Sequence, residues 1–197
     1  MPNHEVRLVA VDPLAQDIYR LRFERPVGFT FDPGQYLRFH HGGVSRDYTL
    51  VNAPQAAELE ICVRHLPEGR FTPALISASV GRPFPVEGPL GYFRFQGDPG
   101  HSVCVATGTG VAPFVAFVRA GLRGFTLLHG APTVDELLYR DELAAAAGIY
   151  RACLSGLPDG DSGGASDGQF RGRVTALLES MPSKPYAFYL CGNAAMI

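Results

Sequence analysis

The chain has 197 residues, of which 46% are hydrophobic and 18% are charged, and its formal net charge is -2. This composition favours one or two packed domains and excludes a disordered chain. A nearly neutral chain without a long basic run does not match a nucleic-acid-binding or membrane-surface protein. No apolar stretch approaches the ~20 residues of a membrane span, and the first seven residues lack the apolar core of a signal peptide. We therefore expect a cytoplasmic protein without a membrane span.

The first half has the pattern of an antiparallel barrel. Short stretches of alternating apolar and polar residues recur, separated by turn residues such as Asp12 and Pro13. One brief helical segment is predicted, at residues 72–77. This spacing is typical of a Greek-key β-barrel. The predicted strands are residues 5–11, 17–23, 35–39, 46–51, 58–65, 84–86 and 92–95.

In the second half, predicted strands alternate with helices, which favours an open α/β domain with a parallel sheet. Its predicted strands are residues 103–106, 125–129, 150–154 and 186–190. The first predicted helix begins at Pro113. The second begins at a capping box formed by Thr133 and Glu136 and ends at Gly148. The third begins at residue 172. Residues 156–169 are predicted to form a mobile loop. We place the domains at 1–97 and 98–197, and expect the second to be incomplete because no helix follows the last strand.

The cysteines stand alone in the sequence, without a Cys-x-x-Cys pair. A zinc or iron–sulfur site within the chain is therefore not expected. Three of the four lie in apolar runs and are predicted to be small core residues. His40 and His41 precede a Gly-Gly turn without a second ligand at suitable spacing, so they too predict no metal site. The cysteines are Cys62, Cys104, Cys153 and Cys191.

Residues 103–119 carry a signal for nucleotide binding. A buried strand runs into a turn with glycines at positions 108 and 110, and Pro113 suits the first turn of the helix that follows. Glycine allows a ligand to approach the backbone, and a helix start presents free N–H groups and a positive dipole end. A nucleotide diphosphate is the expected ligand. Pro113 replaces the third glycine of the common dinucleotide fingerprint, so this turn alone does not decide the function.

Further motifs stand before and after this turn in a fixed order. They are Arg46-Asp-Tyr-Thr49, Cys62-Val-Arg64, Gly69-Arg-Phe-Thr72, Gly88-Pro-Leu-Gly91 and Cys191-Gly-Asn-Ala-Ala-Met196. Strand alternation should send Arg46 and Tyr48 to one side. Together with Thr-Gly-Thr-Gly-Val-Ala-Pro113, these motifs resemble the ferredoxin–NADP reductase family of flavoproteins, from about residue 5 to the last residue.

The resemblance implies an NAD(P)H-dependent flavoprotein reductase that binds FAD, in preference to FMN, and NADH or NADPH. Arg46 would pair with a flavin phosphate, Tyr48 would lie against the flavin ring, and the Thr49 hydroxyl would bond near its N5. The implied flavin contacts also include Val63, Arg64, Gly69, Phe71 and Thr72. The implied nicotinamide nucleotide contacts are Thr107, Gly108, Thr109, Gly110, Pro113, Arg173, Cys191 and Gly192. Thr49 and Cys191 are the candidate catalytic residues.

The resemblance leaves the electron acceptor open. A ferredoxin, a flavodoxin or an oxygenase component would receive the electrons from a monomeric reductase. Reduction of free flavin or another small acceptor is an alternative, and so is a flavin- or nucleotide-binding regulatory module without turnover. A yellow preparation bleached by NADH or NADPH would separate an enzyme from such a module.

The choice between the two nicotinamide cofactors depends on arginines that grip the 2′-phosphate. NADP-using relatives commonly place one after the second strand of this domain (Gly-x-Arg), one after the third (Ser-Arg) and one in a later Gly-Arg-Val. Here Pro132 and Gly156 stand at the first two positions and Arg173 remains at the third, unless the loop of residues 156–169 brings Arg171 or Arg151 into a missing position. The sequence therefore favours NADH or dual use.

Overall fold

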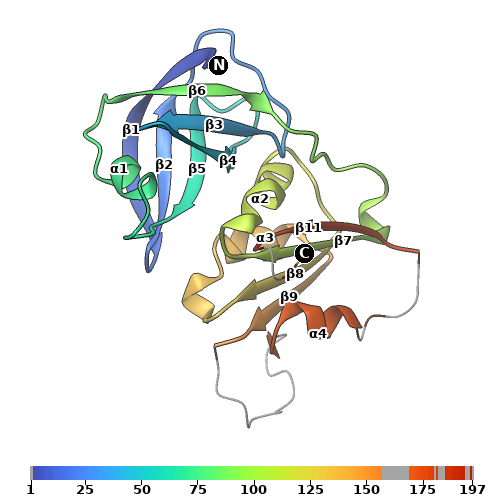
Figure 1. Cartoon of the computed structure of the whole chain (residues 1–197). Coiled ribbons are helices and arrows are strands. Elements are labelled where there is room, and N and C mark those ends of the chain that lie inside the picture. The colour runs from blue at the N-terminus through green and yellow to red at the C-terminus, as the bar shows by residue number, and fades with distance from the viewer. Residues whose placement is uncertain (1, 157–168, 180, 182–184, 194–195, 197) are drawn as a thin grey trace. The chain divides into compact units, whose positions relative to one another are not determined.

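Figure 1 shows the computed structural model of the chain, which describes residues 2–156, 169–179, 181, 185–193 and 196. The chain divides into two compact units, residues 1–94 and 95–197. The sequence places this boundary after residue 97. Phe95 belongs to the second unit because its ring stacks on that of Tyr189, with a centroid distance of 4.8 Å, and contacts Phe117.

The first unit is an antiparallel barrel, as the sequence predicts. Its elements are β1 (His4–Ala15), β2 (Ile18–Glu24), β3 (Tyr36–His41), β4 (Val44–Thr49), β5 (Glu58–Arg64), α1 (Thr72–Ile76) and β6 (Pro83–Leu90). The strand order is β4-β3-β6-β1-β2-β5. Insertion of β6 between β3 and β1 gives the crossed connectivity of Greek-key barrels. A bridge between Leu50 and Ile61 joins the two ends of the sheet and closes the barrel.

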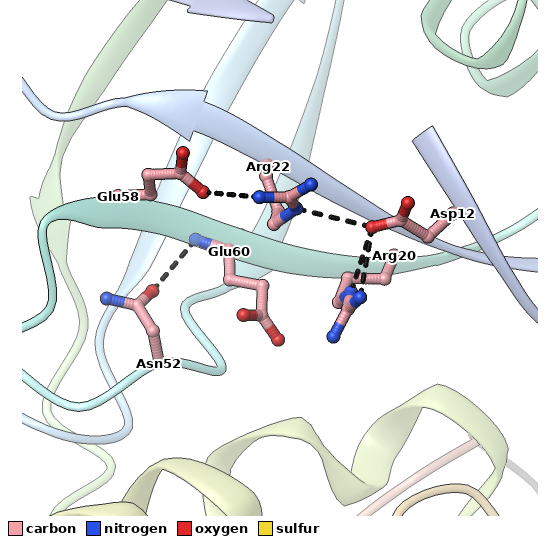
Figure 2. A network of polar contacts seen from close by, with 6 residues as sticks. All are labelled: Asp12, Arg20, Arg22, Asn52, Glu58 and Glu60. Atoms are coloured by element: carbon pink, nitrogen blue, oxygen red, sulfur yellow. Dashed lines mark hydrogen bonds and ion pairs between the residues drawn. The ribbon is translucent and has the colours of Figure 1, made fainter. Parts of the chain in front are cut away.

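Strand alternation in this unit separates an apolar interior from a polar outer face. In the interior the Phe23 ring lies 5.2 Å from that of Phe39 and 6.1 Å from that of Phe84. On the outer face, Figure 2 shows Arg22 between two carboxylates, at 3.2 Å from Asp12 and 2.9 Å from Glu58. Because this network is partly exposed, water screens its ion pairs and each contributes little to stability.

Two details of the first unit differ from the sequence prediction. Pro13 lies inside β1 rather than in a turn, and the chain reverses at Asp17, whose φ is 56°. Residues 92–95 form no strand. Gly91, with a φ of 96°, takes the chain out of the extended conformation, and Tyr92 is 92% exposed, so no buried face favours pairing.

The second unit is built on a parallel sheet, which also confirms the prediction. Its strands are β7 (Ser102–Thr107), β8 (Thr126–Ala131), β9 (Ile149–Leu154), β10 (Gln169–Arg171) and β11 (Ala187–Cys191), in the order β10-β9-β8-β7-β11. Its helices are η1 (Pro99–His101), η2 (Gly108–Val111), α2 (Ala112–Arg119), η3 (Val134–Glu136), α3 (Arg140–Ala146) and α4 (Val174–Glu179). Figure 1 shows α2 and α3 on one side of this sheet and α4 on the other.

The region after β8 contradicts the predicted capping box. The Thr133 side chain makes no capping hydrogen bond, and only the short η3 forms there. The chain then turns at Tyr139, whose φ is 56°, and α3 ends at Ala146 before Gly148. Burial of Leu137, at 4% exposure, explains the irregular path between the two helices.

Two further expectations concern the remaining parts of the chain. Residues 157–168 of the predicted mobile loop lie outside the described residues, whereas Gln169 belongs to β10, a strand that the sequence did not predict. In the described ranges, no helix is both long enough and apolar enough to cross a membrane.

Candidate cofactor-binding sites

The glycine-rich turn lies at the carboxyl edge of the parallel sheet, where open α/β domains bind ligands. It leaves the end of β7, which pairs with β11 on one side and β8 on the other. Cys191 lies opposite Ala106 in this register. The structure therefore brings the turn together with Cys191 and Gly192, two segments far apart in the sequence.

The contact between these two segments depends on glycine. A Cβ on Gly110 would lie 2.6 Å from both the Cys191 carbonyl carbon and the Gly192 Cα. A Cβ on Gly192 would collide with the Thr107 hydroxyl oxygen. That same hydroxyl accepts the backbone N–H of Asn193 at 3.4 Å. The backbones consequently approach more closely than residues with side chains would allow.

The outer side of the turn has the properties of a phosphate cradle. Gly108 has a φ of 54°, and a Cβ built on it would meet no atom within 4 Å. The turn continues into α2 through η2, with the Ala112 N–H bonded to the Thr109 carbonyl and Pro113 in the first turn. An open glycine surface at the start of an eight-residue helix fits a dinucleotide diphosphate.

Cys191 differs from the other cysteines because its side chain is only partly buried. Burial raises the pKa of its thiol, so the group is neutral near pH 7. A neutral thiol beside the cradle can contact a ligand, but it is neither a good nucleophile nor a proton acceptor. The three buried cysteines are core residues, as predicted.

The positions predicted to recognise the 2′-phosphate follow three neighbouring strands. Pro132 follows β8, Gly156 follows β9 and Arg173 follows β10. The Gly156 N–H donates to the Pro132 carbonyl at 2.9 Å, and a Cβ on Gly156 would lie 2.7 Å from that oxygen. The backbone contact therefore disfavours an arginine at position 156. Arg173 is exposed.

On the barrel, the predicted flavin residues lie on the edge strand β4. Arg46 pairs with Phe39 and Tyr48 with Leu37, so both share the face predicted for them. Thr49 lies on the opposite face, at the strand end. Tyr48 is half-buried, and its ring lies 5.8 Å from Phe39. Burial raises the pKa of Tyr48 to about 12, with a smaller opposing effect of Arg46, so the phenol is neutral.

Arg46 is available to an anionic ligand. Its side chain is exposed and donates to the Ser45 carbonyl at 2.7 Å. Within the described residues it forms no ion pair, whereas Arg38 on the next strand is paired with Asp47 at 2.7 Å. A guanidinium group without a carboxylate partner fits the phosphate of a flavin nucleotide.

The remaining predicted flavin contacts lie near β4 because the barrel closes between β4 and β5. The side chains of Val63 and Phe71 are buried in the core, which leaves their backbone groups as the predicted flavin contacts. The Thr72 hydroxyl accepts the Leu66 N–H at 3.0 Å, and the Gly69 N–H donates to the Leu66 carbonyl at 2.8 Å. These groups stabilise the loop itself. Arg64 ends β5 and is half-buried.

Sequence reasoning missed His129 on β8. It is fully buried, and its Nδ1 lies 3.0 Å from the Tyr150 hydroxyl oxygen. Its Nε2 has no hydrogen-bond partner in the part of the chain that the structure describes. The strand registers place His129 in one row with Ala106 and Cys191, one residue before the glycine-rich turn begins at Thr107. A histidine inside the apolar run 125–129 was the available signal.

Each half of the chain matches a known protein family. Residues 5–95 match the family described as oxidoreductase FAD-binding domain, and residues 104–197 match the oxidoreductase NAD-binding domain. Ferredoxin–NADP reductase B of Sorangium cellulosum is 37% identical over 156 residues, covering 73% of this chain and 64% of that protein.

Two further similarities extend over nearly the whole chain. The reductase component of the Pseudomonas putida naphthalene 1,2-dioxygenase system is 32% identical, covering 96% of this chain and 61% of that protein. The structure of a ferredoxin NADP+ reductase from Neisseria gonorrhoeae with bound FAD and NADP has a TM-score of 0.80 at 21% identity. It covers 98% of this chain and 86% of that chain, and it shows the shared fold. The chain spans 61–64% of the length of the curated relatives it matches first.

Proposed function

The chain belongs to the ferredoxin–NADP reductase family of oxidoreductases, and we propose that it passes electrons from NADH or NADPH through FAD to an acceptor protein. The acceptor would be a ferredoxin, a flavodoxin or an oxygenase component. Relatives that are reductase components of dioxygenase and monooxygenase systems support this class of acceptor.

The observation that carries the proposal is the contact of the Thr107–Gly110 turn with the end of β11. An open phosphate cradle and a partly exposed thiol lie side by side at the carboxyl edge of a parallel sheet. This arrangement would bind the dinucleotide diphosphate through backbone N–H groups of the turn and of the α2 start. Cys191 would contact the nicotinamide and limit how closely it approaches.

The barrel residues would hold the flavin. Arg46 would bind a phosphate oxygen, the neutral Tyr48 ring would pack on the flavin, and the Thr49 hydroxyl would hydrogen-bond to it. The backbone of Val63 and Arg64 would border the ring. A bound flavin would supply the redox chemistry, hydride acceptance from the nicotinamide and release of single electrons. The protein residues bind and orient the cofactors, and no side chain is needed as an acid or base.

We also propose NADH, or NADH together with NADPH, as the electron donor. Support comes from the backbone contact of Gly156 with Pro132, which disfavours an arginine at position 156. Of the three positions at which NADP-using relatives place an arginine, Arg173 is then the one that carries it. FAD is proposed over FMN because residues 5–95 match an FAD-binding domain.

A steady-state assay tests the acceptor. The purified, flavin-loaded protein should oxidise NADH when a one-electron protein acceptor such as a [2Fe–2S] ferredoxin is present, with the rate saturating in ferredoxin. Free FAD or FMN at the same concentration is the matched control. Faster and saturable turnover with free flavin alone would contradict a protein acceptor and favour the small-acceptor alternative.

A further inference from the structure

Tyr189 lies two residues before Cys191 on the same strand and the same face. Leu190, between them, points to the opposite face and packs with the core residues Val103 and Val105. Since alternate residues of a strand share a face, Tyr189 belongs to the side on which Cys191 lies. A side chain at this position can control the end of β11.

One side chain satisfies both backbone groups of Gln96. The Tyr189 hydroxyl accepts the Gln96 N–H at 2.9 Å and donates to the Gln96 carbonyl oxygen. The Tyr189 ring also stacks on Phe95, with a centroid distance of 4.8 Å and an interplanar angle of 21°. Tyr189 therefore attaches the first two residues of the second unit to β11 by both polar and aromatic contacts.

The aromatic contacts continue from Phe95 into α2. The Phe95 ring lies 6.0 Å from that of Phe117, which lies 6.1 Å from that of Phe114. This helix follows the glycine-rich turn directly, whereas β11 ends at Cys191. The four rings thus connect α2 with β11.

The position of β11 in the sheet makes such support necessary. Among the described residues, β11 pairs with β7 and stands at the edge of the sheet, without a strand on its outer side. An edge strand is hydrogen-bonded to a neighbouring strand on one side only, so fewer backbone contacts hold it in place. We propose that Tyr189 is a positioning residue: by fixing Phe95 and Gln96 it holds the end of β11 in place, and with it the Cys191 thiol and the close contact with Gly110. The part that concerns hydride transfer rests on the proposed function.

The test compares Tyr189→Phe with Tyr186→Phe. Tyr189→Phe removes the hydroxyl bonds and keeps the ring, whereas Tyr186 packs in the cluster on the other face, where it serves as the matched control. Alkylation of the protein as purified, without added nicotinamide cofactor, by a maleimide reports on Cys191, because the other three thiols are buried. We expect its rate constant to rise roughly tenfold in Tyr189→Phe, the factor that one or two lost hydrogen bonds allow. Tyr186→Phe should alkylate at the parent rate.

A second readout concerns the cofactors. In stopped-flow reduction of flavin-loaded Tyr189→Phe, the limiting rate with NADH should fall about tenfold while the flavin dissociation constant stays unchanged. Phe95→Leu removes the ring stack and keeps the Tyr189 hydroxyl. It should likewise raise the alkylation rate and lower the rate of flavin reduction. Unchanged alkylation in both variants would overturn the proposal. Faster alkylation in a protein whose flavin no nicotinamide cofactor reduces would support the positioning role and refute the proposed function instead.

Discussion

Gly110 lies against the carbonyl carbon of Cys191, at a distance that leaves no room for a side chain: a Cβ there would stand 2.6 Å away. This contact joins the turn after β7 to the end of β11. The sequence alone suggests that Gly110 is needed to admit a ligand. The structure shows that it is needed first for the approach of two backbone segments, so its replacement should disturb the nucleotide site even without ligand.

Gly110→Val should abolish reduction by NADH, because either the turn or β11 must move away from its present position. Overpacking of this kind costs about 1–3 kcal/mol, so the second unit should also be less stable. Flavin binding should persist, since it belongs to the barrel. Gly100→Ala, whose Cβ would make an ordinary contact at 3.5 Å, is the control. Parent-like reduction kinetics in Gly110→Val would rule out this turn as the site.

Arg46→Ala should weaken flavin binding about tenfold or more, because a charge-assisted hydrogen bond contributes about 1.5–3 kcal/mol. Equilibrium titration with FAD, followed by quenching of flavin fluorescence, measures the change. Arg38→Ala removes an arginine that is already paired with Asp47 and should bind FAD as the parent does. A folded Arg46→Ala protein with parent-like affinity would show that the phosphate lies elsewhere.

Cys191→Ala should lower the limiting rate of flavin reduction several-fold and leave the NADH dissociation constant unchanged. Because burial raises the thiol pKa, the rate in the parent should not follow a thiol titration between pH 6 and 8. Stopped-flow kinetics from pH 6 to 8 measure the limiting rate, the NADH dissociation constant and the pH dependence of the rate separately. A variant as fast as the parent would indicate that Cys191 only fills volume.

Arg173→Ala should reduce kcat/KM for NADPH and leave the value for NADH unchanged, since the 2′-phosphate is the group it would contact. Parallel steady-state assays of the parent, Arg173→Ala and Arg171→Ala measure this. In the parent, NADH should be used at least as well as NADPH. A kcat/KM for NADPH a hundredfold above that for NADH would refute the preference.

His129 should make the second unit less stable in mild acid. Burial lowers its pKa to about 4, so the folded state holds the imidazole neutral. The contribution of the neutral imidazole to the free energy of unfolding is fully present above the unfolded pKa of about 6.5. It is lost as the pH falls from there toward 4, and the loss is on the order of 3 kcal/mol in all. Urea unfolding at pH 7.5 and 5.5 should show a smaller pH effect in His129→Leu than in the parent or in His4→Gln. An equal loss of unfolding free energy between pH 7.5 and 5.5 in all three proteins would contradict the role given to His129.

Periodicity predicted the architecture well because burial dictates it. Val103, Cys104 and Val105 are fully buried in β7, and the alternating strands of the barrel have apolar inner faces. The capping box failed because the residues after it, Leu137 and Leu138, are both buried and override local helix signals. The strand at 169–171 was missed because three residues carry too little pattern.

The candidate site was only partly predictable from the sequence. Motifs located Arg46, Tyr48 and the glycine-rich turn, since each has a local signature. The contact of Gly110 with Cys191 and the link of Tyr189 to Gln96 depend on strand order, which no local pattern encodes. The same holds for His129, whose burial follows from the neighbouring strands rather than from its own sequence context.

The central claim is that the flavin held by this chain is reduced by a nicotinamide cofactor bound at the glycine-rich turn. Anaerobic addition of one equivalent of NADH to the FAD-loaded protein tests it most directly through the visible absorbance of the oxidised flavin. We expect prompt and complete bleaching in the parent and none in Gly110→Val that still carries flavin. A parent spectrum unchanged by both NADH and NADPH would contradict the account and leave a binding module without turnover.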